Sequence, residues 1–295
     1  MFRGSLVLML TVLVLASCST TDPEPVERIV DVGTHVLHAT VSGAGVPVVV
    51  IDGGIAAPAS EYAQLRDTIA AATTVVTYDR AGYGSSDPGP LPRDSQTVAS
   101  ELRTLLKELG LAGPYILVGH SLGGLNMQVF AAAYPEVVAG MVLLDPPPPG
   151  FILGEEYVQL ASMASRMTDE WQGIADRGME SEDRQERAEA VFFRMLASEH
   201  REMFGASAEQ ARSVDSFGDT PLVVVASGVP NPMFGDVAEA YQEYWAAESE
   251  ALASKSSRGT FLFAESSTHR LHDDAADLVA NTIIGMVRSA RQETR

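Results

Sequence analysis

The sequence has very little cysteine and lysine. Cys18 is the one cysteine among 295 residues, so an intramolecular disulfide is excluded and the chemistry of the folded domain cannot depend on a thiol. Lysine occurs only at positions 107 and 255, and 39 acidic residues against 20 basic ones give a formal net charge of −19. Because such a surface repels phosphate backbones, nucleic-acid binding is disfavoured.

The N-terminal apolar run, residues 6–15, is too short to span a membrane comfortably. It follows Arg3 and precedes small residues, which is the order found in a secretory signal. Residues 15–18, Leu-Ala-Ser-Cys, resemble a bacterial lipobox, in which the cysteine is acylated and becomes the first residue of the mature chain. We therefore expect an exported protein that is lipid-anchored to the cell envelope through Cys18. The alternative is an ordinary secretory signal with an incidental cysteine.

The remaining chain alternates short β-branched runs with helical patterns. Strands are expected at residues 28–32, 35–41, 46–51, 74–78, 115–118, 138–144, 222–226 and 260–263. Helices are expected between them, for example at residues 60–71 and 274–286, and a further one is capped by Asp94 or Ser95 and stopped by Gly110. This alternation predicts an α/β fold with a mostly parallel central sheet flanked by helices.

The alternation breaks after residue 145, where four prolines precede a long helical region without a strand candidate. We expect a helical cap at 146–217 over the edge of the sheet, with the core formed by 28–145 and 218–295. Residues 1–17 are then the lipoprotein signal peptide and 18–27 a polar tether. Five apolar cap residues are expected either to line a pocket or to pack within the cap: Met163, Met167, Trp171, Phe192 and Phe193.

The most informative stretch is residues 114–124, Pro-Tyr-Ile-Leu-Val-Gly-His-Ser-Leu-Gly-Gly. A strand leads into Ser121 and a helix is expected directly after it. A sharp turn of this kind presents the hydroxyl to substrate but crowds the residues two before and two after the serine. Gly119 and Gly123 occupy those two places, where the absence of a Cβ relieves the clash. The pattern predicts Ser121 as a nucleophile that a neighbouring base must activate.

On these residues the chain resembles the α/β-hydrolase superfamily, over residues from about 29 to 287. Gly-His-Ser-Leu-Gly-Gly is the form common in its esterases and lipases. Residues 78–86, Tyr-Asp-Arg-Ala-Gly-Tyr-Gly-Ser-Ser, also look like the loop that the family carries at that point. The resemblance implies a catalytic triad in the chain order serine, acid, histidine.

The family order implies a histidine base after the last strand, where the chain offers His269 and His272. His269 follows the strand through a small, polar segment and is the preferred base. His272 stands beside Asp273 and Asp274 at a helix start and is expected to be a surface residue. His120 is the variable residue of the serine turn and is expected to pack beside it.

Two aspartates are candidates for the acid of the triad. Many relatives carry it after the strand that we expect at 222–226, where the first carboxylate is Asp236. Other members carry it at the end of the preceding strand, where this chain has Asp145 followed by a proline that favours extended geometry. Asp145 is preferred, and its alternative role is that of a structural turn acceptor.

Two backbone N–H groups are implied as donors to the oxyanion that forms on the substrate carbonyl. One is the N–H of Leu122, directly after the nucleophile. The other comes from residues 52–55, Asp-Gly-Gly-Ile, which resemble the family's glycine-containing oxyanion loop; Ile55 is preferred, with Gly54 as the fallback. The loop departs from the commoner His-Gly start by having Asp52, whose carboxylate is expected to be structural.

The resulting expectation is a serine hydrolase, a carboxylesterase acting on a small ester, thioester or lactone through an acyl-enzyme, with no cofactor and no metal. Peptidase, carbon–carbon bond hydrolase and cofactor-free peroxidase activities use similar triads and stay open. A different class also stays open: a surface-displayed binding protein that keeps the fold without catalysis. Dehalogenases and epoxide hydrolases of this fold are disfavoured because they need aspartate at position 121.

Overall fold

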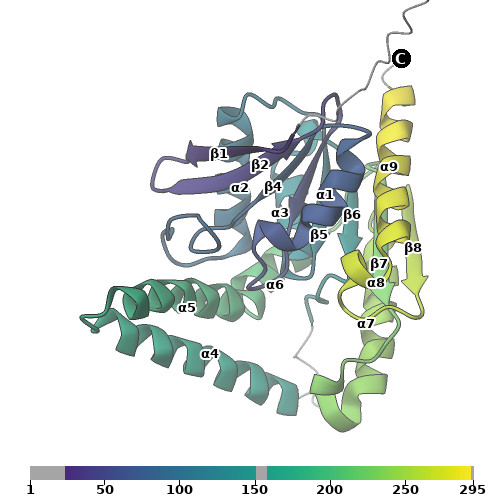
Figure 1. Ribbon diagram of the computed structural model, residues 1–295. Coiled ribbons are helices and arrows are strands. Elements are labelled where there is room, and N and C mark those ends of the chain that lie inside the picture. Colours follow the sequence, from purple (N-terminus) through teal and green to yellow (C-terminus); the bar gives the residue numbers. More distant parts are fainter. Residues whose placement is uncertain (1–23, 151–157, 294–295) are drawn as a thin grey trace, which may run out of the picture.

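The computed structural model describes residues 24–150 and 158–293, whose centre is an eight-stranded sheet in the order β1-β2-β4-β3-β5-β6-β7-β8 (Figure 1). β2 runs antiparallel to β1 and β4, and every later pairing is parallel. The strands are β1 (Val26–Asp31), β2 (Val36–Ser42), β3 (Val48–Asp52), β4 (Val75–Tyr78), β5 (Tyr115–His120), β6 (Val138–Leu144), β7 (Leu222–Ser227) and β8 (Gly259–Ala264). The expected α/β fold with a mostly parallel sheet is confirmed.

The strand bounds differ from the expected ones by only a few residues. β3, β4 and β5 are buried along their whole length, which explains their uninterrupted apolar runs. β1 begins two residues inside the expected tether, because Val26 and Glu27 pair with Val41 and Thr40 of β2. The expected signal peptide and Cys18 lie outside the described residues.

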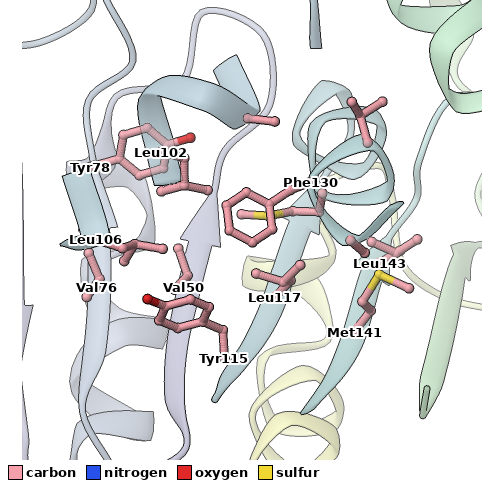
Figure 2. Close-up of a cluster of buried hydrophobic side chains, with 14 of the residues drawn as sticks. Val50, Val76, Tyr78, Leu102, Leu106, Tyr115, Leu117, Phe130, Met141 and Leu143 are labelled. Atoms are coloured by element: carbon pink, nitrogen blue, oxygen red, sulfur yellow. The ribbon is translucent and has the colours of Figure 1, made fainter. Parts of the chain in front are cut away.

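Helices cover both faces of the sheet (Figure 1). One face packs against α2 (Ser95–Glu108), α3 (Leu122–Ala133) and α7 (Ala238–Ala253), and the other against α1 (Ala63–Ala70) and α9 (Ala276–Glu293). The Asp94 side chain caps α2 by accepting from the N–H of Thr97, and short helices precede α1 (η1, Ala59–Tyr62) and α9 (α8, Leu271–Asp274). Figure 2 shows the first of these layers, where Leu102 and Leu106 of α2 and Phe130 of α3 pack onto residues of β3, β4, β5 and β6.

The cap consists of α4 (Val158–Met179), α5 (Arg184–Met203) and α6 (Ala206–Arg212). α4 and α5 lie side by side, away from the sheet, and α6 packs on α3 (Figure 1). These helices lie within the range expected for the cap. No helix in the two described ranges is both long and apolar enough to cross a bilayer.

Candidate active site

Ser121 stands at a sharp turn between β5 and α3. Its backbone has φ 52° and ψ −123°, a conformation that non-glycine residues rarely adopt. A Cβ at Gly119 would lie 2.5 Å from the carbonyl oxygen of Gly123, and one at Gly123 would lie 2.3 Å from that of Asp52. Since both neighbours are backbone atoms that cannot move aside, these positions require glycine. The turn thus holds a strained serine at the carboxyl edge of the sheet.

His269 and Asp145 meet at the same edge. His269 lies in the loop after β8, and its Nδ1 is 2.6 Å from Oδ2 of Asp145, the residue directly after β6. Asp145 is buried and accepts two more hydrogen bonds, from the N–H of Ser227 to Oδ1 at 2.9 Å and from the Ser227 hydroxyl to Oδ2 at 2.8 Å. A carboxylate oxygen accepts, so His269 carries its proton on Nδ1 and leaves Nε2 with a free lone pair.

Of the two candidate acids, the structure brings Asp145 to His269. Asp236 lies in the short helix η4 (Pro232–Val237) and its side chain is exposed. The expectation of extended geometry at Asp145 is wrong: its φ is 48°, so the chain turns sharply where β6 ends despite the proline that follows. That turn keeps the carboxylate under the histidine loop.

His120 and Tyr62 link the histidine loop to the segment after β3. The Tyr62 hydroxyl is 2.7 Å from Nδ1 of His120, and Nε2 of His120 is 2.8 Å from the carbonyl oxygen of His269. Because that carbonyl can only accept, His120 holds its proton on Nε2 and accepts from Tyr62. Burial lowers the pKa of His120 well below its usual value, in agreement with a neutral ring. As expected, His120 packs beside the serine turn.

The expectation for His272 is wrong, because its ring is buried and not on the surface. It lies 4.7 Å from the Tyr62 ring and 4.9 Å from the His120 ring, measured between centroids. The short helix α8 turns Leu271 and His272 inward and leaves Asp273 and Asp274 exposed. Burial lowers the pKa of His272, and the contacts give it a packing role behind the site.

Residues 53–56 form a turn beside Ser121, which we call the 53–56 turn. A Cβ placed on Gly54 would lie 3.4 Å from Cβ of Ser121. The N–H of Gly54 donates to the Tyr62 hydroxyl at 2.9 Å, and the N–H of Ala56 donates to the Tyr83 hydroxyl at 3.2 Å. Among the described residues, the N–H of Ile55 between them has no acceptor. This favours Ile55 over Gly54 as a donor to a ligand.

Leu122 supplies a second amide of the same kind. It is the first residue of α3, so its N–H has no acceptor within the helix. The side chain of Ile55 packs against the apolar cluster that contains Leu122. The N–H groups of Ile55 and Leu122 are therefore the two candidate donors to an anion at Ser121.

A cavity of about 370 Å³ opens onto these groups. Ile55, Ser121, Asp145 and His269 line it from the core. The cap and α7 supply most of its other side chains, chiefly apolar ones: Leu160, Met163, Ala164, Met167, His200, Met203, Phe204, Gln242 and Trp245. The loop after β7 adds residues 229–234 to the wall, and none of the described lining residues is lysine or arginine.

The cap residues named from the sequence divide into two groups. Met163 and Met167 line the cavity, whereas Trp171, Phe192 and Phe193 are absent from its wall. Trp171 packs edge-on against His200, and Phe192 lies between Tyr83 and Phe193. The shared helical spacing of these residues could not separate the faces of α4 and α5.

Several residues of the cavity wall were missed by sequence reasoning, among them Trp245, Gln242 and His200. Trp245 and Gln242 come from α7, whose aromatic residues at helical spacing, Tyr241 and Trp245, were the available signal. His200 stands in the cavity wall with Nδ1 2.6 Å from the Thr168 hydroxyl, and burial lowers its pKa to about 4. No local pattern distinguishes His200 from an ordinary helix residue.

Comparisons with known proteins agree with this architecture. A family model described as alpha/beta hydrolase fold matches residues 46–250. The chain is 26% identical over 219 residues to the uncharacterized protein YqjL of Bacillus subtilis, covering 74% of this chain and 75% of that protein. It is 31% identical over 120 residues to 2-(acetamidomethylene)succinate hydrolase of Mesorhizobium japonicum, covering 41% and 42%.

Solved structures show the same fold. A thermophilic esterase from Thermogutta terrifontis superposes with a TM-score of 0.62 at 19% identity, over 89% of this chain and 99% of that one. The haloalkane dehalogenase DatA from Agrobacterium tumefaciens superposes with a TM-score of 0.64 at 13% identity, over 90% and 97%. At these identities the similarity concerns the fold alone.

Proposed function

The chain belongs to the alpha/beta hydrolase fold family, and on this premise we propose that it is a serine hydrolase that cleaves a carboxylic ester, or a related thioester or lactone. One observation carries the proposal. The Nδ1 of His269 lies 2.6 Å from the buried Asp145 carboxylate, and both residues line the cavity that Ser121 also lines. This combination of nucleophile, base and acid is what acyl transfer through a serine requires.

In the first half-reaction, the Ser121 Oγ attacks the substrate carbonyl carbon while Nε2 of His269 accepts the hydroxyl proton. The carbonyl oxygen becomes an oxyanion, which accepts hydrogen bonds from the N–H groups of Ile55 and Leu122. The bond to the alcohol oxygen then breaks, and His269 returns its proton to that oxygen. The alcohol leaves and the acyl group stays on Ser121.

In the second half-reaction, water replaces the alcohol. His269 accepts a proton from the water as its oxygen attacks the acyl carbonyl, and the same two N–H groups receive the oxyanion. The bond to the Ser121 Oγ breaks, that oxygen regains a proton from His269, and the carboxylic acid is released. Asp145 holds the ring tautomer in both steps and stabilises the imidazolium.

Ser121 disfavours two other reactions of this fold. The dehalogenase and epoxide hydrolase reactions of this fold need an aspartate at that position, as noted above, and a serine cannot replace it in them. The neighbour from Thermogutta terrifontis is named an esterase, which is the class proposed here.

The cavity supports a neutral, apolar substrate. Its cap side is formed by leucine, methionine and aromatic side chains, and its described wall contains no lysine or arginine to pair with a substrate carboxylate. The formal charge of −19 further disfavours anionic substrates. The relative from Mesorhizobium japonicum is named for a succinate substrate, so we propose a different substrate class for this chain.

The test is turnover of p-nitrophenyl butyrate by the purified protein and by four variants. Ser121→Ala and His269→Ala should each reduce kcat by at least about 10³-fold, because each removes a member of the proton-transfer system. Ser254→Ala and His38→Gln, which replace a serine and a histidine away from the cavity, should keep the original rate. Unchanged turnover in Ser121→Ala would refute the proposal.

A further inference from the structure

A buried ion-pair network joins the cap to the 53–56 turn. Its members are Asp52 at the end of β3, Arg80 in the loop after β4, and Glu199 on α5 of the cap. The side chains of all three are at most 1% exposed. Arg80 and Glu199 lie 119 positions apart in the sequence, so this contact exists only because the cap folds back over the core.

Arg80 uses all five of its N–H donors within this network. Nε and Nη2 donate to the two carboxylate oxygens of Glu199 at 2.9 and 3.0 Å. Nη1 donates to Oδ1 of Asp52 and to the carbonyl oxygen of Gly53, both at 2.7 Å, and Nη2 also donates to the carbonyl oxygen of Gly54 at 2.7 Å. The guanidinium therefore holds two consecutive carbonyl groups of the 53–56 turn.

Glu199 also reaches the turn by a second route. Its Oε2 accepts a hydrogen bond from the Tyr83 hydroxyl at 2.7 Å. The same hydroxyl accepts from the N–H of Ala56 at 3.2 Å. Through Arg80 and Tyr83, one carboxylate on the cap thus orients the peptide groups before and after Ile55.

The position of the buried Arg80 guanidinium depends on the negative charge of Glu199. Burial lowers the pKa of Arg80, but the carboxylates of Glu199 and Asp52 raise it by more, so its pKa lies well above the usual value. Removing one carboxylate would leave buried donors of Arg80 without an acceptor, and the guanidinium would have to move or admit water. Either change would shift the two carbonyl groups that it holds.

We propose that Glu199 is a positioning residue for the oxyanion, acting through Arg80 and Tyr83 on the N–H of Ile55. The inference rests on the proposed function, since it concerns the same site. Glu199 is not among the described residues that line the cavity. Its effect falls on the transition state, because the N–H of Ile55 meets a full negative charge only there.

If Glu199 only attached the cap to the core, its substitution would have a different effect on the kinetics. A loosened cap changes how the substrate is held and therefore changes KM. A displaced Ile55 N–H lowers kcat and leaves KM nearly unchanged. It also reduces the preference for an oxygen over a sulfur at the reacting carbonyl, because sulfur is larger and accepts hydrogen bonds weakly from the same amides.

The experiment compares Glu199→Gln with the unsubstituted protein on p-nitrophenyl butyrate and on its thionoester, in which sulfur replaces the carbonyl oxygen. The glutamine side chain has one oxygen that can accept from Arg80 and one nitrogen that cannot, so one of the two hydrogen bonds between residue 199 and the guanidinium is lost. We therefore expect kcat for the oxygen ester to fall by about 10- to 100-fold, with KM within about twofold of the original. The oxygen-to-sulfur ratio of kcat/KM should fall with it. Tyr83→Phe, which removes the link to Ala56, should shift the ratio in the same direction by a smaller factor.

Glu101→Gln is the matched control. Glu101 forms a two-bond pair with the buried Arg93, at 2.6 and 2.5 Å, away from the cavity. Its substitution should lower stability without changing kcat or the oxygen-to-sulfur ratio. The inference is overturned if Glu199→Gln and Tyr83→Phe keep the original ratio, or if Glu101→Gln changes it equally. A lack of turnover by the unsubstituted protein would overturn the proposed function and this inference together.

Discussion

Replacing Asp145 with asparagine tests the assignment of the acid through the proton position on His269. Oδ1 of Asp145 accepts from the N–H of Ser227, which can only donate, so the amide nitrogen of asparagine cannot take that place. The amide nitrogen must therefore take the place of Oδ2, where it faces the Ser227 hydroxyl and Nδ1 of His269. The hydroxyl can rotate and accept, whereas His269 must give up its Nδ1 proton and carry one on Nε2.

With its proton on Nε2, His269 cannot accept the proton of Ser121. The same change of tautomer in comparable sites lowers kcat by about 10⁴-fold, which corresponds to about 5 kcal/mol of transition-state stabilisation. We expect Asp145→Asn to lose kcat by this factor on p-nitrophenyl butyrate. The rate is measured from the absorbance of the released p-nitrophenolate. The melting temperature, measured in parallel, should show that the variant is folded.

Asp236→Asn is the control, since Asp236 is exposed in η4 and was the other candidate acid. It should retain the original kcat. A kcat of Asp145→Asn within about tenfold of the unsubstituted value would refute Asp145 as the acid. A large loss of kcat in Asp236→Asn instead would also refute it.

Three further predictions concern the turn, the cap and the N-terminus. Gly123→Ala places a Cβ 2.3 Å from the Asp52 carbonyl oxygen and should lower the free energy of unfolding by about 1–3 kcal/mol in urea; Gly285→Ala, with open space around its Cβ, should not. The pKa of His200 is lowered to about 4, below the unfolded value of 6.5, so stability is full above pH 6.5 and declines as the pH falls toward 4. His200→Phe should flatten that decline in denaturant titrations, and an unchanged slope would contradict it. Cys18→Ser should move the protein from the membrane fraction to the soluble fraction of its native host, and persistent attachment would argue against acylation.

The sequence predicted the parts of the site that have local signatures. Ser121 follows from two glycines at fixed spacing, and His269 from its place after the last strand. The choice between Asp145 and Asp236 stayed open, because which carboxylate meets the histidine depends on how the loops after β6 and β7 fold. For Asp145, the decisive contacts are the hydrogen bonds from Ser227.

What could not be predicted depends on pairings across long distances in the chain. Nothing around Glu199 distinguishes it from the solvated acidic residues of α5, yet it is fully buried against Arg80. His272 was misplaced because two aspartates follow it, although its own side chain turns toward Tyr62. Helical periodicity predicted the cap helices but not which of their faces meets the cavity.

Activation of the Ser121 hydroxyl by His269 can be measured without a substrate. The measurement is the mass of the protein after treatment with a fluorophosphonate, followed by peptide mapping of the modified residue. We expect one adduct per chain, on Ser121, and its loss in His269→Ala. An unmodified protein, or an adduct that persists at the same rate without His269, would contradict it and favour a binding protein that keeps the fold without the chemistry.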